Sequence, residues 1–128
     1  MVSRGIRGAT TVPENDEKQI IHHTKQVLKE MIEANDVKPE DVSHVFVSAT
    51  KGIDAVFPAR ALREFPGWTM VPVMCMAEID VQNSLEKCIR IMMVVNTDKG
   101  QDEIKHVFQN EAVKLRPDLV EKRGQDSE

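Results

Sequence analysis

An amphipathic segment at residues 17–34 constrains the fold of this chain more than any other feature. Its apolar residues fall on one stripe at the period of an α-helix, and lysines and glutamates occupy the opposite side. The apolar stripe consists of Ile20, Ile21, Val27, Leu28, Met31 and Ile32. Pro13, Asn15 and Asp16, just before this segment, are typical of a turn and a helix N-cap. The sequence therefore predicts one long helix that covers an apolar surface.

That apolar surface is predicted to be a β-sheet. Strands are expected at residues 2–12, 42–50, 69–76 and 87–97. The last is the clearest, because its odd-numbered residues from Ile89 to Val95 share one apolar face. Pro72 lacks a backbone N–H, so its strand is expected at an edge or a bulge. Pro58 is expected to begin a short helix at 59–65, a second short helix is expected at 100–110, and 112–115 is expected to be extended. The predicted fold is α+β, with a single mixed sheet and the long helix on one face.

Composition restricts the class of protein. The 128 residues suit one domain, expected at 1–119 and followed by a polar tail at 120–128. No stretch approaches the ~18 apolar residues of a membrane span, and the first residues lack a secretory signal, so a cytoplasmic location is expected. Asp and Glu total 21 against 17 Lys and Arg. This acidic balance argues against nucleic acid or a membrane surface as partner.

Arg90 is the most informative candidate functional residue. It interrupts a strand whose neighbours on both faces are apolar, so its guanidinium is expected below the protein surface, where it needs an anionic partner. That partner is either a carboxylate such as Glu78, in a structural ion pair, or a bound anion. Arg7, Arg63 and Arg116 also interrupt apolar sequence. Because arginine binds carboxylate through two parallel hydrogen bonds, the four indicate a small molecule with more than one carboxylate.

Other chemistries lack a signature in this sequence. The adjacent His22 and His23 point apart on a helix, so no metal site is predicted. Cys75 has no identifiable base beside it, and it is interpreted as a small buried apolar residue rather than a nucleophile. Neither Gly-rich phosphate-binding pattern is present.

Several sequence blocks occur in one order along nearly the whole chain. They are RGIRGATTV (4–12), SAT (48–50), AVFPARALRE (55–64), VPVMCM (71–76), KCIRIMM (87–93) and AVKLRPDL (112–119). Together they resemble the monofunctional bacterial chorismate mutases of the AroH class. The resemblance implies a homotrimer whose sheets form a pseudo-α/β barrel, with active sites at the subunit clefts. It implies the rearrangement of chorismate to prephenate, in phenylalanine and tyrosine synthesis, without cofactor, metal or covalent intermediate.

The resemblance also implies site residues. Arg90 would meet the ether oxygen, Arg7 a substrate carboxylate, and Glu78 the substrate hydroxyl and the positive fragment. Cys75 would contribute at the same hydroxyl. The remaining substrate-binding positions are Phe57, Ala59, Arg60, Arg63, Val73, Met74, Met76, Ala77, Phe108, Leu115 and Arg116. Of these, Phe57, Ala59, Arg60 and Arg63 would come from the neighbouring subunit, and Arg116 with the tail would help close the site.

Two positions depart from the family pattern. Phe108 stands where a tyrosine is common, and Met74 where a smaller, often hydroxylated residue is usual. Both changes predict weaker substrate binding with the chemistry retained. Two alternatives to a mutase stay open: a trimer that only senses a small dicarboxylate, and an enzyme of different chemistry, such as imine hydrolysis, on a similar scaffold.

Overall fold

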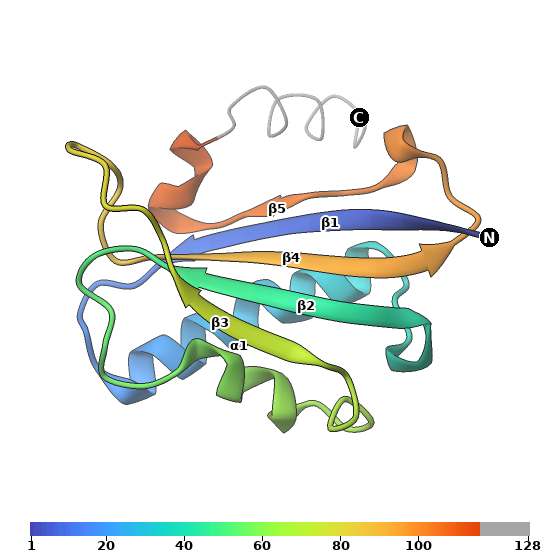
Figure 1. Cartoon of the computed structure of the whole chain (residues 1–128), viewed down its shortest axis with the longest axis horizontal. Helices are drawn as coiled ribbons and strands as arrows, with labels where there is room; N and C mark the ends of the chain where they lie inside the picture. The colour runs from blue at the N-terminus through green and yellow to red at the C-terminus, as the bar shows by residue number, and fades with distance from the viewer. Residues whose placement is uncertain (116–128) are drawn as a thin grey trace.

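A computed structural model describes residues 1–115 of the chain as one five-stranded mixed sheet with a long helix against it (Figure 1). The strand order is β3-β2-β4-β1-β5. The strands are β1 (Val2–Thr11), β2 (Val42–Ala49), β3 (Val73–Ala77), β4 (Cys88–Thr97) and β5 (Val107–Phe108). The helix is α1 (Glu17–Ala34), and the 3₁₀ turns are η1 (Pro39–Asp41), η2 (Pro58–Glu64), η3 (Gln101–Glu103) and η4 (Asn110–Lys114). The predicted mixed sheet with one long helix is confirmed.

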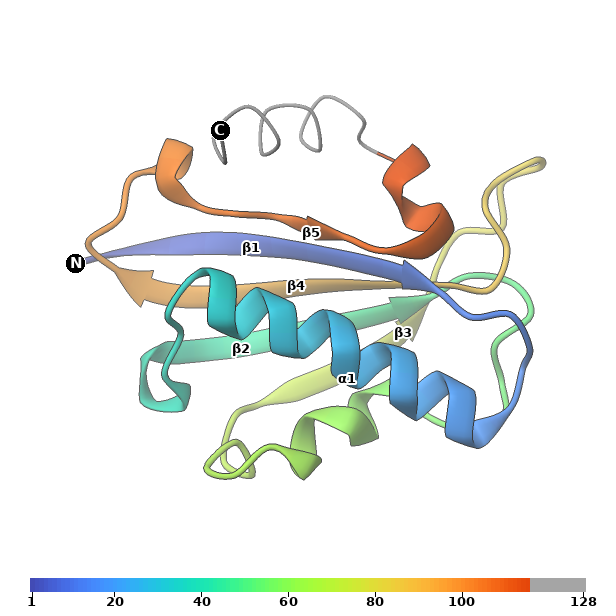
Figure 2. The ribbon, with the colours of Figure 1, turned by 180° about the vertical axis from the view of Figure 1, so that it is seen from behind.

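Helix α1 begins and ends where the sequence predicts. The Asp16 carboxylate accepts a hydrogen bond from the Gln19 backbone N–H, which satisfies one of the free donors at the helix start. The buried residues Ile20, Thr24, Val27, Leu28 and Met31 recur every three or four positions and form the face that meets the sheet. Figure 2 shows α1 lying across this face of the sheet.

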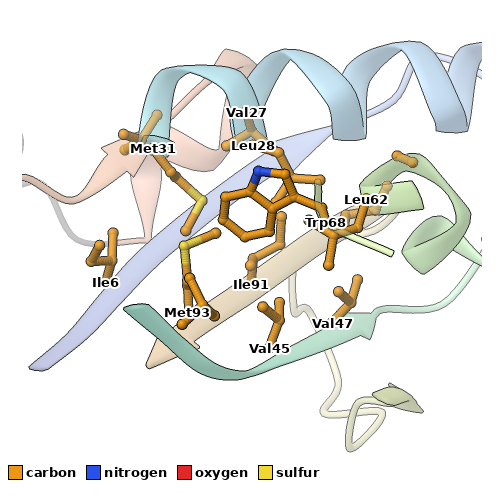
Figure 3. Packing of buried hydrophobic residues seen from close by; sticks show 14 of the residues in the cluster. Ile6, Val27, Leu28, Met31, Val45, Val47, Leu62, Trp68, Ile91 and Met93 are labelled. Atoms are coloured by element: carbon orange, nitrogen blue, oxygen red, sulfur yellow. The ribbon is translucent and has the colours of Figure 1, made fainter. Parts of the chain in front are cut away.

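The hydrophobic core lies between α1 and the sheet. Figure 3 shows Leu28 and Met31 of the helix packed towards Ile91 and Met93 of β4, with Trp68 beside them. Ile89, Ile91, Met93 and Val95 are buried, so the apolar face predicted for this strand is confirmed. Burying these side chains is the main stabilising contribution to the sheet–helix pair.

The sheet face opposite α1, here called the open face, is covered only at one end within residues 1–115. There Ala112 of η4 packs on Ala9 and Cys88. Farther along, four large apolar side chains remain 38–60% exposed: Phe46, Met74, Met76 and Met92. A contiguous apolar patch of this kind marks a surface at which something else binds.

Three sequence-based expectations are wrong in detail. Residues 100–110 are not a helix: η3 occupies three of them, and Val107 and Phe108 pair in parallel with Gly8 and Ala9. Long-range hydrogen bonds from Asn35 to Lys105 hold this segment extended, and they override its local helix propensity. The segment 112–115, expected to be extended, lies largely in the 3₁₀ turn η4.

The third correction concerns the strand expected at 69–76. It begins only at Val73, because residues 69–70 form a turn. The Pro72 carbonyl, just before the strand, accepts a hydrogen bond from the Val45 N–H. The strand does lie at the edge of the sheet, as the proline predicts. The short helix expected at 59–65 is the 3₁₀ turn η2, with Pro58 in its first turn. Arg116 and the tail at 120–128 lie outside the described residues.

Candidate functional site

Arg90 is the third residue of β4, the central strand, and faces the open side of the sheet. It pairs with Ala9 of β1 on one side and Ser48 of β2 on the other. Its Nε donates to Glu78 Oε2 at 2.7 Å, and its Nη2 donates to Oε1 of the same carboxylate. The ion pair considered from the sequence is therefore present. It uses the two-bond geometry in which arginine binds carboxylates most strongly.

Glu78 is brought to Arg90 by the end of β3. Its backbone N–H donates to the Ala49 carbonyl at 3.0 Å, so the chain stays beside β2 for one residue beyond the strand. The Glu78 side chain is 14% exposed, whereas that of Arg90 is 42% exposed. The expectation that the Arg90 guanidinium lies below the protein surface is thus wrong for a single chain, because residues 1–115 leave that part of the open face partly exposed. The hydrogen bonds to Glu78 raise the pKa of Arg90, which keeps the guanidinium charged.

Arg7 lies on the same face, two residues before the partner of Arg90 on β1. It pairs with Met92 of β4, and its guanidinium carbon is 5.9 Å from the centre of the Phe108 ring. This cation–π contact joins β1 to β5. The Arg7 backbone N–H donates to Nδ1 of His106 at 2.9 Å.

Arg7 and Arg90 line one cavity of about 260 Å³ on the open face. Its other walls are formed by Gly8, Ala9, Phe46, Ser48, Met76, Ile91, Met92 and Phe108. Two guanidinium groups against the one carboxylate of Glu78 leave this region positive, although the chain as a whole carries a net charge of −4. The arrangement can bind a small anion with carboxylate groups, held by charge and by parallel hydrogen bonds.

A second set of expected site residues lies around a different hollow. Phe57, Arg60, Cys75 and Ala77 line a hollow of about 640 Å³ between β3, η2 and the preceding loop, and Met76 borders both hollows. Strand alternation turns Cys75 away from Met74 and Met76. Within one chain, therefore, the Cys75 thiol does not line the arginine cavity.

The thiols of this chain are poor nucleophiles at neutral pH. Burial raises the pKa of Cys75, although a hydrogen bond from the Ala59 backbone opposes that shift. Burial, followed by the Glu78 charge, raises the pKa of Cys88 to about 11. Both groups are therefore protonated thiols near pH 7.

The other expected site residues within 1–115 are not among the lining residues of these two hollows. Arg63 is exposed on η2, and Ala59 and Val73 are half-buried against the core. Met74 is exposed on the open face of the edge strand. Leu115 packs against the cluster of Ala9, Cys88 and Ala112. One chain thus brings together Arg7, Glu78, Arg90, Met76 and Phe108, and leaves the η2 group apart.

Several residues of the cavity were not found from the sequence. Phe46 and Ser48 line it because the β2–β4 register places them beside Met92 and Arg90. The alternation of β2 gives their shared face, but only the strand order shows that this is the face of Arg90. The sequence around His106 also carries no signal that marks it as a site residue.

No group of three or more His, Cys, Asp or Glu side chains within residues 1–115 is arranged to hold a metal ion. Over the same residues, no helix is long and apolar enough to cross a membrane.

Comparison with known proteins gives consistent matches. The profile of the family Chorismate mutase type I matches residues 3–119. A curated relative from Bacillus subtilis (strain 168), Chorismate mutase AroH, is 56% identical over 119 residues, which is 93% of this chain and 94% of that protein. Chorismate mutase AroH of Thermus thermophilus is 41% identical over 117 residues, 91% of this chain and 95% of that protein. The solved structure of a chorismate mutase from Clostridium thermocellum superposes with a TM-score of 0.83 at 51% identity, covering 88% of this chain and 98% of that one.

Proposed function

We propose that Arg7, Glu78 and Arg90 bind and rearrange chorismate, because this chain belongs to the family Chorismate mutase type I. The family and the named relatives give the chain its activity: it is an isomerase, a chorismate mutase. This activity feeds the synthesis of aromatic amino acids. The observation that supports the proposed site most directly is that Arg7 and Arg90 line a single cavity and that Arg90 is bonded to the Glu78 carboxylate.

The chemistry places a specific demand on such a site. Chorismate is a dianion, and as its ether bond breaks, negative charge develops on the ether oxygen while the allylic fragment becomes positive. Substrate and product are isomers, so the reaction needs no redox partner or group carrier. The protein must fold the substrate into its reactive shape and stabilise the separated charge.

Arg90 is the group we assign to the developing negative charge. A guanidinium has five N–H donors, and the bonds to Glu78 use two of them. The remaining donors meet the ether oxygen and a neighbouring carboxylate. A preorganised donor at a point of developing charge commonly contributes about 3–4 kcal/mol to transition-state stabilisation. The position of Arg90 on a strand paired on both sides supports this role, because it fixes the backbone beneath the guanidinium.

Arg7 and Glu78 take the two remaining roles. Arg7 holds a substrate carboxylate from the β1 side of the cavity, and Phe108 supports its guanidinium through the ring contact. The Glu78 carboxylate accepts a hydrogen bond from the substrate hydroxyl and faces the positive fragment. Its bonds with Arg90 hold the two groups side by side, so that the guanidinium can face the ether oxygen while the carboxylate faces the positive fragment.

We further propose that the working enzyme is a homotrimer with sites between subunits. The exposed Phe46, Met74, Met76 and Met92 give the open face an apolar surface of the kind that association covers. The cavity of about 260 Å³ is smaller than the ~300–1,000 Å³ usual for small-molecule pockets, as expected if another subunit supplies a wall. Phe57, Ala59, Arg60 and Arg63, which lie in η2 or just before it, would form that wall.

The test is the loss of chorismate's ultraviolet absorbance, measured with the wild-type protein and with Arg90→Ala. We expect rapid loss with the wild type and a kcat at least about 100-fold lower in the variant. Arg4→Ala is the matched control: it removes a guanidinium from β1 that bonds the Lys99 carbonyl outside the cavity, and it should leave kcat unchanged. Arg90→Ala with a kcat within tenfold of wild type would contradict the assignment. Light scattering that gives a monomer at assay concentration would contradict the shared site.

A further inference from the structure

A hydrogen bond to a histidine fixes the backbone of Arg7. Strand β5 pairs with β1 at two positions only, Gly8 with Val107 and Ala9 with Phe108. Arg7 lies one residue before this ladder. Its N–H donates to Nδ1 of the His106 imidazole at 2.9 Å. The side chain thus extends the β1–β5 pairing by one residue.

The backbone that carries His106 is itself fastened on both sides. Before it, the Lys105 N–H donates to Asn35 Oδ1 at 2.8 Å, and Asn35 Nδ2 donates to the Lys105 carbonyl at 2.9 Å. Asn35 is buried at the end of α1. After it, the Gln109 N–H donates to the Ala9 carbonyl at 2.9 Å. The imidazole is therefore presented to β1 from a segment anchored to the helix and to the strand.

The geometry also fixes the chemical form of the ring. Because Nδ1 accepts the Arg7 N–H, it carries no proton, and the neutral ring holds its proton on Nε2. An asparagine at this position would place its Oδ1 where Nδ1 now lies and keep the acceptor. A leucine would keep comparable volume and remove it, leaving a partly buried N–H without this partner.

We propose that His106 is a positioning residue for substrate binding: its Nδ1 holds the Arg7 backbone so that the guanidinium is aimed into the arginine cavity beside Phe108. The inference rests on the proposed role of Arg7 as a carboxylate-binding group. It assigns His106 no contact with the reacting bond. Arg90 lies on β4, which pairs directly with β2 and β1 and not with β5, so the loss of the acceptor affects substrate binding more than the chemical step.

Steady-state kinetics with His106→Leu and His106→Asn test the proposal. In His106→Leu we expect KM to rise about five- to tenfold, because the variant loses one hydrogen bond of average net strength. Its kcat should stay within about twofold of wild type. His106→Asn should stay within about twofold of wild type in both constants. In an Arg7→Ala background, His106→Leu should raise KM no further, because the residue acts through Arg7. His22→Asn, on the exposed side of α1, is the matched histidine control.

Other results overturn the proposal. Equal impairment of the asparagine and leucine variants would show that the acceptor is not what matters, and a KM effect that persists in Arg7→Ala would show that His106 does not act through Arg7. Hydrogen exchange of the Arg7 amide gives a readout that needs no activity and works in the wild-type protein. The amide should be protected in wild type and His106→Asn; an unprotected wild-type amide overturns the inference even if His106→Leu fails to fold. Failure of the proposed function appears separately, as a wild-type protein without mutase activity.

Discussion

Replacing Gly8 with alanine tests the contact between β1 and α1 directly beneath the arginine cavity. A Cβ built on Gly8 would lie 2.1 Å from the sulfur of Met31 and 3.0 Å from its terminal carbon. Met31 is fully buried, so its thioether cannot turn into solvent and the core must shift. Overpacking of this kind lowers the free energy of unfolding by about 1–3 kcal/mol. Removing glycine raises it by roughly 0.5–1 kcal/mol, because alanine loses less conformational entropy than glycine when the chain folds. We expect the free energy of unfolding to fall by about 1–2 kcal/mol, and Tm by about 3–8 °C.

The control is the same substitution in a Met31→Ala background, compared in urea at one fixed protein concentration because association shifts apparent stability. Met31→Ala alone should cost about 2–5 kcal/mol, and there Gly8→Ala should become neutral or stabilising because the methyl group enters the space left by the thioether. Gly5→Ala, whose new Cβ would lie 3.1 Å from the partly exposed Met92 sulfur, should cost less than Gly8→Ala. An equal loss for Gly8→Ala in both backgrounds would refute the argument, since the clash with Met31 would then not be the cause.

Three further predictions follow from individual contacts. Phe108→Tyr should lower KM for chorismate about threefold or more with kcat nearly unchanged, because the added hydroxyl can donate to a substrate carboxylate; an effect on kcat alone would contradict this. Cys88, with a pKa of about 11 and a buried side chain, should resist iodoacetamide at pH 7.5 in the native protein, and mass spectrometry should detect alkylation only after unfolding. Asn35→Ala should lower the free energy of unfolding by about 2–4 kcal/mol in urea, because it breaks both bonds to Lys105 inside the protein. Asn96→Ala, which loses one exposed bond, should cost below about 0.5 kcal/mol.

The elements that could be predicted from the sequence are those whose signal is local. Helix α1 carries its periodicity in its own residues and its cap in Asp16 just before them, so both of its ends can be predicted. In strand β4, buried and more exposed residues alternate from Ile89 to Asn96. The segment 100–110 has no such signal. Its extended form depends on Asn35, seventy residues away, and on two backbone pairs with β1. Such contacts belong to the tertiary structure, so local propensity gave the wrong element.

The same distinction applies to the candidate site. Arg90 was recognisable because an arginine inside an apolar strand needs a partner, and Glu78 is that partner. The exposure of the Arg90 side chain could not be predicted from the sequence. A strand with apolar residues on both faces has the same pattern whether its second face is covered by its own chain or by another chain. Ser48 and His106 could not be identified from the sequence for a related reason. Each lies at the site only because of its position relative to another strand, Ser48 beside Arg90 of β4 and His106 beside Arg7 of β1.

The two arginines of the cavity differ in how firmly the sheet holds them, and the difference matches their proposed roles. Arg90 lies on β4, which pairs with β1 over ten residues and with β2 from Val42 to Ala49. Arg7 lies on β1, whose other neighbour, β5, contributes only two paired residues. Stabilising a developing charge requires a donor that does not reorganise during the reaction, whereas a carboxylate that is charged throughout can be gripped by a more adjustable group. Changes that loosen β5 should therefore weaken binding through Arg7 well before they affect the charge stabilisation that depends on Arg90.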